Sequence, residues 1–201
     1  FWKRGINVEK LIVEIEGSGR HVHLTDETAE ILFGKGYKLQ PKRSLTLAKA
    51  FACQEKVTLR GPRGEIENVS ILGPNRRDVQ VEVSFTDART LGIKPPVRNS
   101  GDVKGSSPIT IVGPAGTLEL EEGAIVANRH IHMSTATAEK FGYKDGDTVK
   151  VRCGAGLRTI VMENVLIRVG SSLDSMHIDY DEQNAAGMFD VKPMLDEVIR
   201  D

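Results

Sequence analysis

Four of the five histidines form two His-x-His pairs, and these pairs lie in segments that are near copies of one another. Residues 20–25 read Arg-His-Val-His-Leu-Thr, and residues 129–134 read Arg-His-Ile-His-Met-Ser. Because side chains alternate along an extended strand, both imidazoles of a pair point to one face, roughly 6–7 Å apart along the strand. Two imidazoles on one face can bind one metal ion, so the pattern indicates a metal site in each half of the chain.

Each His-x-His pair has a candidate third ligand in a later strand. The strand at 79–84 aligns with the strand at 175–179, and Glu82 and His177 then hold the same place, opposite the apolar face. The predicted ligand sets are His21, His23 and Glu82 for one metal, and His130, His132 and His177 for the other. Three protein ligands with an open position are typical of catalytic zinc sites, and the mixed imidazole and carboxylate set favours zinc or a neighbouring divalent metal over calcium or magnesium. The alternative is a duplicated strand that keeps its histidines for packing, which explains the matching third ligands less well.

The repeat extends beyond the histidines and predicts the architecture. Thr28-Ala29-Glu30 recurs as Thr137-Ala138-Glu139, and Phe33-Gly34 recurs as Phe141-Gly142. Each copy reads as a strand, a capping residue (Thr25 or Ser134) and a short helix, followed by short strands and glycine turns. We therefore predict a mainly β fold of two small pseudo-symmetric β-barrels capped by short α-helices, joined near residues 98–107. The residues alone leave open which barrel the strands at 11–15 and 124–127 complete.

Composition excludes several other classes of protein. The net charge is −1, so no electrostatic attraction of nucleic acid or of an acidic membrane is expected, and aromatic residues make up only 5%, which disfavours a base-stacking platform. No apolar run approaches the roughly 20 residues that span a bilayer. Cys53 and Cys153 are best interpreted as two reduced thiols, Cys53 in the core and Cys153 at a strand end, although a disulfide is an alternative. Neither cysteine has a neighbouring histidine that would make it a candidate nucleophile.

Arginines near the predicted ligands could bind an anion. Arg76 and Arg77 follow the turn at 73–75 and lead into the Glu82 strand, where a planar guanidinium suits bidentate phosphate binding. A solvated pair of turn residues is the alternative interpretation. Arg20 and Arg129 could bind substrate, or could orient a neighbouring carboxylate or a loop carbonyl.

Several motifs together resemble one known family. They are Arg20-His21-Val22-His23-Leu24, Gly73-Pro74-x-Arg76 leading to Val81-Glu82-Val83, Thr86-Asp87-Ala88-Arg89-Thr90-Leu91-Gly92-Ile93, and Asn128-Arg129-His130-Ile131-His132-Met133. In these segments the chain resembles the PduL-type phosphotransacylases, also called phosphate propanoyltransferases, of bacterial microcompartments. The resemblance runs from about Leu11 to the C-terminus with almost no gaps.

The resemblance implies an acyltransferase that interconverts a short acyl-CoA (propanoyl-CoA or acetyl-CoA) plus phosphate with the acyl phosphate plus coenzyme A. It implies two zinc ions per chain on the six ligands named above, with Arg76 binding phosphate. The coenzyme A path would include Ser18, Arg43, Leu72 and Asn184. Because the first strand of this fold completes the C-terminal barrel, the implied domains are 20–127 and 9–19 plus 128–201. The chain departs from the family at Gly17-Ser18-Gly19, where Val-Ser-Asn is common.

The resemblance also implies partners and a location. A homodimer is expected, with microcompartment shell or cargo proteins as further partners, and with no nucleic acid or membrane. Members often carry an N-terminal encapsulation peptide, and Phe1 to Gly5 is too short to be one intact. The expected location is the microcompartment lumen, or the cytoplasm if that peptide is absent.

The chemistry of the predicted sites independently favours acyl transfer. A zinc ion with an open position can hold the coenzyme A sulfur as thiolate, while the second zinc and Arg76 bind phosphate. Since no residue qualifies as a covalent acyl carrier, we predict direct transfer in a ternary complex. The alternatives are a di-zinc hydrolase of a thioester or phosphoester, and a non-catalytic metal-binding module of a shell scaffold.

Overall fold

The computed structural model describes residues 9–45, 50–154, 156–188 and 194–199. The described residues form two compact units, one within residues 17–128 and 178–183, the other within residues 9–16, 129–177 and 184–199. Of the four chain positions where the units meet, two fall inside strands and one falls inside a helix. The predicted domain limits of 20–127 and 9–19 plus 128–201 stay a prediction, because compactness alone does not establish an independently folding domain. The expected remnant of an encapsulation peptide at Phe1 to Gly5 lies outside the described residues.

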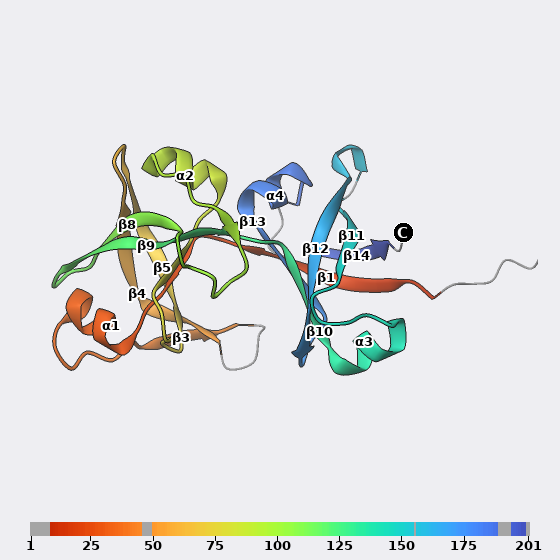
Figure 1. Cartoon of the computed structure of the whole chain (residues 1–201), viewed down its shortest axis with the longest axis horizontal. Helices are drawn as coiled ribbons and strands as arrows, with labels where there is room; N and C mark the ends of the chain where they lie inside the picture. Colours follow the sequence, from red (N-terminus) through yellow and green to blue (C-terminus); the bar gives the residue numbers. More distant parts are fainter. Residues whose placement is uncertain (1–8, 46–49, 155, 189–193, 200–201) are drawn as a thin grey trace, which may run out of the picture. The chain divides into compact units, whose positions relative to one another are not determined.

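The first unit contains a closed β-barrel, which we call the first barrel (Figure 1). Going round the barrel, the hydrogen-bonded neighbours follow the order β4-β5-β2-β6-β9-β8, and β8 returns to β4. Its strands are β2 (His21–His23), β4 (Phe51–Arg60), β5 (Glu65–Gly73), β6 (Gln80–Glu82), β8 (Ser107–Val112) and β9 (Thr117–Ala127). Outside the ring, β3 (Pro41–Ser44) pairs with β4 and β7 (Val97–Arg98) pairs with β9.

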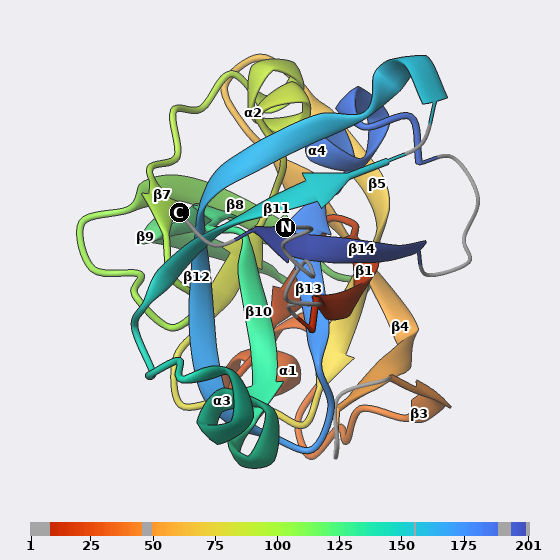
Figure 2. The same cartoon turned by 90° about the vertical axis from the view of Figure 1, so that its right-hand side faces the viewer.

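The second unit contains the second barrel, in which the strand order is β1-β13-β10-β12-β11-β14 (Figure 2). Its strands are β1 (Leu11–Ser18), β10 (His130–Ser134), β11 (Thr148–Cys153), β12 (Ile160–Ser171), β13 (Ser175–Asp179) and β14 (Met194–Ile199). The sequence left open which barrel the strands at 11–15 and 124–127 complete. In the structure, residues 11–15 pair with β14 of the second barrel, and residues 124 and 125 pair with β6 of the first barrel. The prediction of a mainly β fold with two small barrels is confirmed.

The two barrels repeat one pairing scheme, which explains the duplicated sequence. The His-x-His strand runs parallel to its neighbour in both, β2 to β5 and β10 to β12, and antiparallel to the strand carrying the third residue, β6 or β13. His21 pairs with Glu82 in the first barrel, and His130 pairs with His177 in the second. Glu82 and His177 therefore occupy equivalent positions in the two sheets.

Short helices follow directly from the strands that carry the histidines and Glu82. They are α1 (Asp26–Phe33), α2 (Phe85–Leu91), α3 (Thr135–Phe141) and α4 (Tyr180–Ala185), with a 3₁₀ turn at Gly156–Arg158. The predicted caps are confirmed: Thr25 accepts a hydrogen bond from the backbone N–H of Thr28, and Ser134 accepts one from Thr137. Each cap lies two residues beyond the second histidine of its pair, so a helix begins directly after the segment that carries the imidazoles.

The core of the first barrel is aliphatic and closed to solvent. Its fully buried side chains include Leu24, Leu32, Leu59, Ile71, Leu91 and Ile111. Among the described residues, no helix has the length and hydropathy that a membrane crossing requires.

Two neighbouring residues of α1 test how this helix packs on the barrel. Leu32 is fully buried whereas Ile31 is 40% exposed. We expect Leu32→Ala to lower the free energy of unfolding by about 2–5 kcal/mol, since it leaves a cavity in a close-packed core. Ile31→Ala is the matched control and should lower it by much less. Urea unfolding followed by circular dichroism measures both, and equal losses would contradict this packing.

Candidate metal centres

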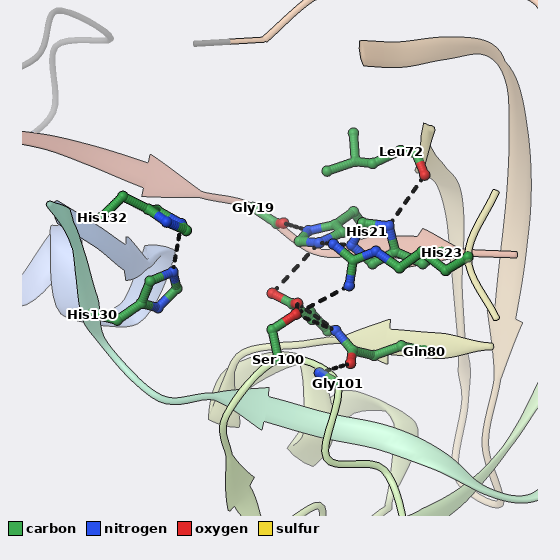
Figure 3. A network of polar contacts seen from close by, with 11 residues as sticks. Gly19, His21, His23, Leu72, Gln80, Ser100, Gly101, His130 and His132 are labelled. Carbon is green, nitrogen blue, oxygen red and sulfur yellow. Dashed lines mark hydrogen bonds and ion pairs between the residues drawn. The ribbon is translucent and has the colours of Figure 1, made fainter. Parts of the chain in front are cut away.

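The first centre consists of His21 and His23 from β2 and Glu82 from β6 (Figure 3). The ligand atoms of the three side chains all lie within 4.8 Å of one another. The two Nε2 atoms of the histidines are 3.2 Å apart, and the Oε2 atom of Glu82 is 3.4 Å from Nε2 of His21. Both imidazoles are buried, at 5% exposure each. The barrel therefore brings together the three residues that the sequence predicted for this site.

Backbone carbonyls fix how the two imidazoles of this centre point. Nδ1 of His21 lies 2.8 Å from the carbonyl oxygen of Gly19, and Nδ1 of His23 lies 3.1 Å from that of Leu72. A carbonyl can only accept, so each Nδ1 carries the proton and donates it. The Nε2 lone pairs of neutral imidazoles then face each other, and this arrangement needs a shared cation, either a proton or a metal ion. Outer hydrogen bonds of this kind are typical of histidines that bind metal.

Electrostatics in the first centre favour neutral His23 beside ionised Glu82. Burial lowers the pKa of His23 to about 3, with His21 and Arg76 adding to the effect. Burial also acts against charge on His21, but the carboxylate of Glu82 outweighs it and raises the pKa of His21. Burial alone would raise the pKa of Glu82, whereas His21, His23 and Ser100 hold it well below its usual range. An ionised carboxylate with a neutral imidazole is the ligand state that a divalent ion requires.

The second centre consists of His130 and His132 from β10 and His177 from β13. The Nε2 atoms of His130 and His132 are 3.0 Å apart, and the ring of His177 lies 5.5 and 5.0 Å from the two other ring centres. Burial, reinforced by His130 and Arg168, lowers the pKa of His132 to about 4. A carboxylate oxygen of Glu16 lies 3.9 Å from Nε2 of His177. Within the described chain, the two triplets are the groups of three or more ligand-type side chains that converge in this way.

Arg76, the predicted phosphate ligand, belongs to the same unit as the first centre. Its backbone N–H donates to the carbonyl oxygen of Leu24 at 2.7 Å, which ties the turn after β5 to the strand of His21 and His23. Its guanidinium Nη1 donates to the hydroxyl of Ser100 at 3.1 Å. Arg76 is exposed, so an anion can approach its guanidinium from solvent.

The residues predicted along the coenzyme A path lie at several places. Arg43 is exposed on β3, where it pairs with Ala52, and Ala52 pairs in turn with Leu72 on β5. A hollow of about 330 Å³ adjoins Arg43 and is lined by Pro41, Lys42, Arg43, Ser44, Leu45, Ala50 and Phe51. Ser18 ends β1 and Asn184 lies in α4. The role of these four residues in binding coenzyme A stays a prediction.

The two glycines on either side of Ser18 lie close to side chains of the segment at 180–183. A Cβ atom at Gly19 would lie 2.7 Å from the ring of Tyr180, and one at Gly17 would collide with the side chain of Gln183. The Gln183 side chain is flexible and could move away, whereas the rigid ring of Tyr180 leaves little room for a Cβ atom at position 19. The Tyr180 ring thus packs against the residue whose backbone carbonyl orients His21.

Two partners of the site were not predicted from the sequence. Arg20 pairs with the buried carboxylate of Asp87 at 2.9 Å, and Asp87 also accepts from the backbone N–H of Ser84 at the start of α2. The ambiguity over Arg20 is thus resolved in favour of a neighbouring carboxylate. Ser100 contacts Glu82 from a segment that the sequence marks only as a polar connector. The composition of this segment does not indicate a contact with Glu82, because that contact depends on the path of the loop.

Comparison with known proteins identifies the family. The family model for phosphate propanoyltransferase matches residues 14–189. A phosphate propanoyltransferase of Thermotoga maritima is 51% identical over 170 residues, which cover 84% of this chain and 81% of the relative. One from Clostridioides difficile is 46% identical over 180 residues (89% and 86%), and one from Lachnoclostridium phytofermentans is 52% identical over 176 residues (87% and 82%). A barrel pair with two ligand triplets is thus the framework of an acyltransferase. The chain belongs to the phosphate propanoyltransferase family.

An acyltransferase can work through a covalent cysteine, and the structure makes this unfavourable here. Both cysteines are free thiols, at 1% exposure for Cys53 and 0% for Cys153. Burial, with the nearby charge of Glu55, raises the pKa of Cys53 to about 11. Since only the thiolate is an effective nucleophile, neither residue is suited to carry an acyl group.

This burial predicts slow alkylation of the folded protein. With excess iodoacetamide at pH 8, we expect native protein to keep both thiols long after urea-unfolded protein has lost them. Mass spectrometry of intact protein measures the difference. Alkylation of the native chain at the rate of the unfolded one would contradict the burial of these cysteines.

Proposed function

We propose that this chain interconverts a short acyl-CoA, propanoyl-CoA or acetyl-CoA, and phosphate with the acyl phosphate and free coenzyme A. We further propose two zinc ions per chain as cofactors, one on each triplet. The family match supports the reaction class. The observation that carries the metal proposal is the convergence of each triplet within 4.8 Å, with the first pair of imidazoles oriented by carbonyls.

The donor sets fit zinc. His21, His23 and Glu82 would hold one ion, and His130, His132 and His177 would hold the other. Three nitrogen or oxygen ligands leave one tetrahedral position for a reactant, and such a set suits zinc better than calcium or magnesium. When bound, zinc supplies Lewis acidity, which stabilises a thiolate and neutralises phosphate charge.

The remaining chemistry rests on the protein's own groups. Arg76 binds the phosphate dianion through its exposed guanidinium and places it for attack. A phosphate oxygen attacks the thioester carbonyl, the carbon–sulfur bond breaks, and the sulfur leaves as the thiolate of coenzyme A. No acyl-enzyme is needed, since both cysteines are buried. Ser18, Arg43, Leu72 and Asn184 line the coenzyme A path in this proposal, with the cationic Arg43 suited to its phosphate groups.

The same proposal extends to assembly and location. We propose a homodimer that resides in the lumen of a bacterial microcompartment, with shell or cargo proteins as partners, or in the cytoplasm where no encapsulation peptide is present. These points rest on the family resemblance of the sequence.

One assay separates the proposed transferase from the alternative, a di-zinc hydrolase. The purified protein is given propanoyl-CoA or acetyl-CoA, and released thiol is measured with and without phosphate. The transferase should release coenzyme A only with phosphate and form acyl phosphate in equal amount. Release without phosphate would instead indicate hydrolysis of the thioester. The protein's two buried thiols add little to the background.

Metal content tests the assignment of the two triplets. We expect two zinc ions per wild-type chain, and one ion in each of His23→Ala and His132→Ala, because each variant loses one member of one triplet. Elemental analysis against protein concentration measures the ratio. A wild-type ratio near zero, or variants that keep both ions, would refute the assignment of the triplets.

A substitution of Arg76 tests its proposed role in binding phosphate. Arg76→Ala should raise the KM for phosphate about tenfold or more, because a charge-assisted bidentate pair is lost. Zinc content should stay at the wild-type value. Arg77→Ala is the matched control, since Arg77 is the next residue and is exposed as well. If Arg76→Ala loses zinc, the residue is structural and the phosphate assignment is wrong.

A further inference from the structure

Ser100 lies at the centre of a hydrogen-bond network beside the first metal centre (Figure 3). It follows β7, in the segment that the sequence marks only as a connector. Its hydroxyl lies 3.1 Å from Nη1 of Arg76, 2.9 Å from Nε2 of Gln80 and 3.1 Å from Oε1 of Glu82. One hydroxyl thus contacts both a predicted metal ligand and the predicted phosphate ligand.

The direction of every hydrogen bond in this network follows from its partners. A guanidinium only donates, so Ser100 accepts from Arg76. The amide of Gln80 is oriented by the backbone N–H of Gly101, which donates to its oxygen at 2.6 Å, and the Gln80 nitrogen therefore faces Ser100 as a donor. With both lone pairs of the Ser100 hydroxyl occupied, its single proton is directed to Glu82.

The two carboxylate oxygens of Glu82 have different contacts. Oε1 accepts from Gln80 at 2.6 Å and from Ser100 at 3.1 Å, whereas Oε2 lies 3.4 Å from Nε2 of His21. One oxygen is held by the network, and the other is left for a metal ion. Partners that orient a metal-binding carboxylate in this way contribute to metal affinity although they never touch the metal.

The same hydroxyl limits the rotation of Arg76. One N–H of its guanidinium donates to Ser100, and this hydrogen bond restricts the orientation of the guanidinium plane. A bidentate contact with phosphate depends on that plane, because both N–H bonds must align at once.

We infer that Ser100 is a positioning residue that orients the Glu82 carboxylate for the metal ion and the Arg76 guanidinium for phosphate together. This inference rests on the proposed function and assigns the connecting segment a part in it. Loss of one hydroxyl should therefore weaken metal binding at one centre and phosphate binding at once.

The experiment compares Ser100→Ala with Ser100→Thr and Ser106→Ala. Ser106 is the matched control, because it lies in the same segment, is similarly half-buried, and accepts a hydrogen bond from the backbone N–H of Gly123 outside the network. Zinc affinity is measured by competition with a chromogenic chelator, and the KM and kcat for phosphate are measured on the zinc-loaded proteins.

In Ser100→Ala we expect one of the two zinc ions to bind at least about tenfold more weakly while the other is unchanged. The KM for phosphate should rise about tenfold as well. Ser100→Thr, which keeps the hydroxyl, should restore both values, and Ser106→Ala should match the wild type.

Wild-type zinc affinity and phosphate KM in Ser100→Ala would overturn the inference and leave the proposed function intact. The same holds if Ser106→Ala shows equal losses, because the effect would then come from the loop in general. A wild-type chain that binds no zinc would contradict the proposed metal centres, and this inference with them.

Discussion

The pairing of a His-x-His strand with one antiparallel neighbour is the constraint on which both centres depend. Because side chains alternate along the strand, both imidazoles point to one face. The antiparallel pairing with β6 or β13 then places a third ligand-type side chain directly opposite the first histidine. A shift of one residue in either strand would turn that ligand to the other face. The barrels protect this register, since the alternate residues, such as Val22, Val81, Ile131 and Met176, are fully buried.

Duplication of this unit produced two centres of different charge. The shared pairing scheme holds Glu82 in one barrel where the other holds His177, so the first triplet carries a carboxylate and the second carries only imidazoles. The carboxylate requires support, which Gln80 and Ser100 give by donating to Oε1. Ser175 occupies the position of Gln80 in the second barrel, where it pairs with His132 as Gln80 pairs with His23. The hydrogen bonds from Gln80 and Ser100 therefore match the negative charge of Glu82 in the first centre.

Local patterns explain why the fold and the convergence of the two triplets could be predicted from the sequence. The strands, the caps at Thr25 and Ser134, and the equivalence of Glu82 and His177 all follow from alternation and internal repetition. Contacts made by loops carry no such signal. Ser100 reaches Glu82 across 18 positions from a glycine-rich connector, and Asp87 reaches Arg20 across 67. The limits of the two units also cut through β1 and β13, which periodicity alone does not indicate.

X-ray absorption at the zinc edge of the loaded enzyme, without coenzyme A, tests the two centres most directly. Five histidines shared by two ions give an average of 2.5 imidazoles per zinc, with zinc–nitrogen distances of about 2.0–2.1 Å and no sulfur ligand. That spectrum is the expected result. A sulfur shell from Cys53 or Cys153, or an average near one imidazole per zinc, would contradict the two triplets as metal centres.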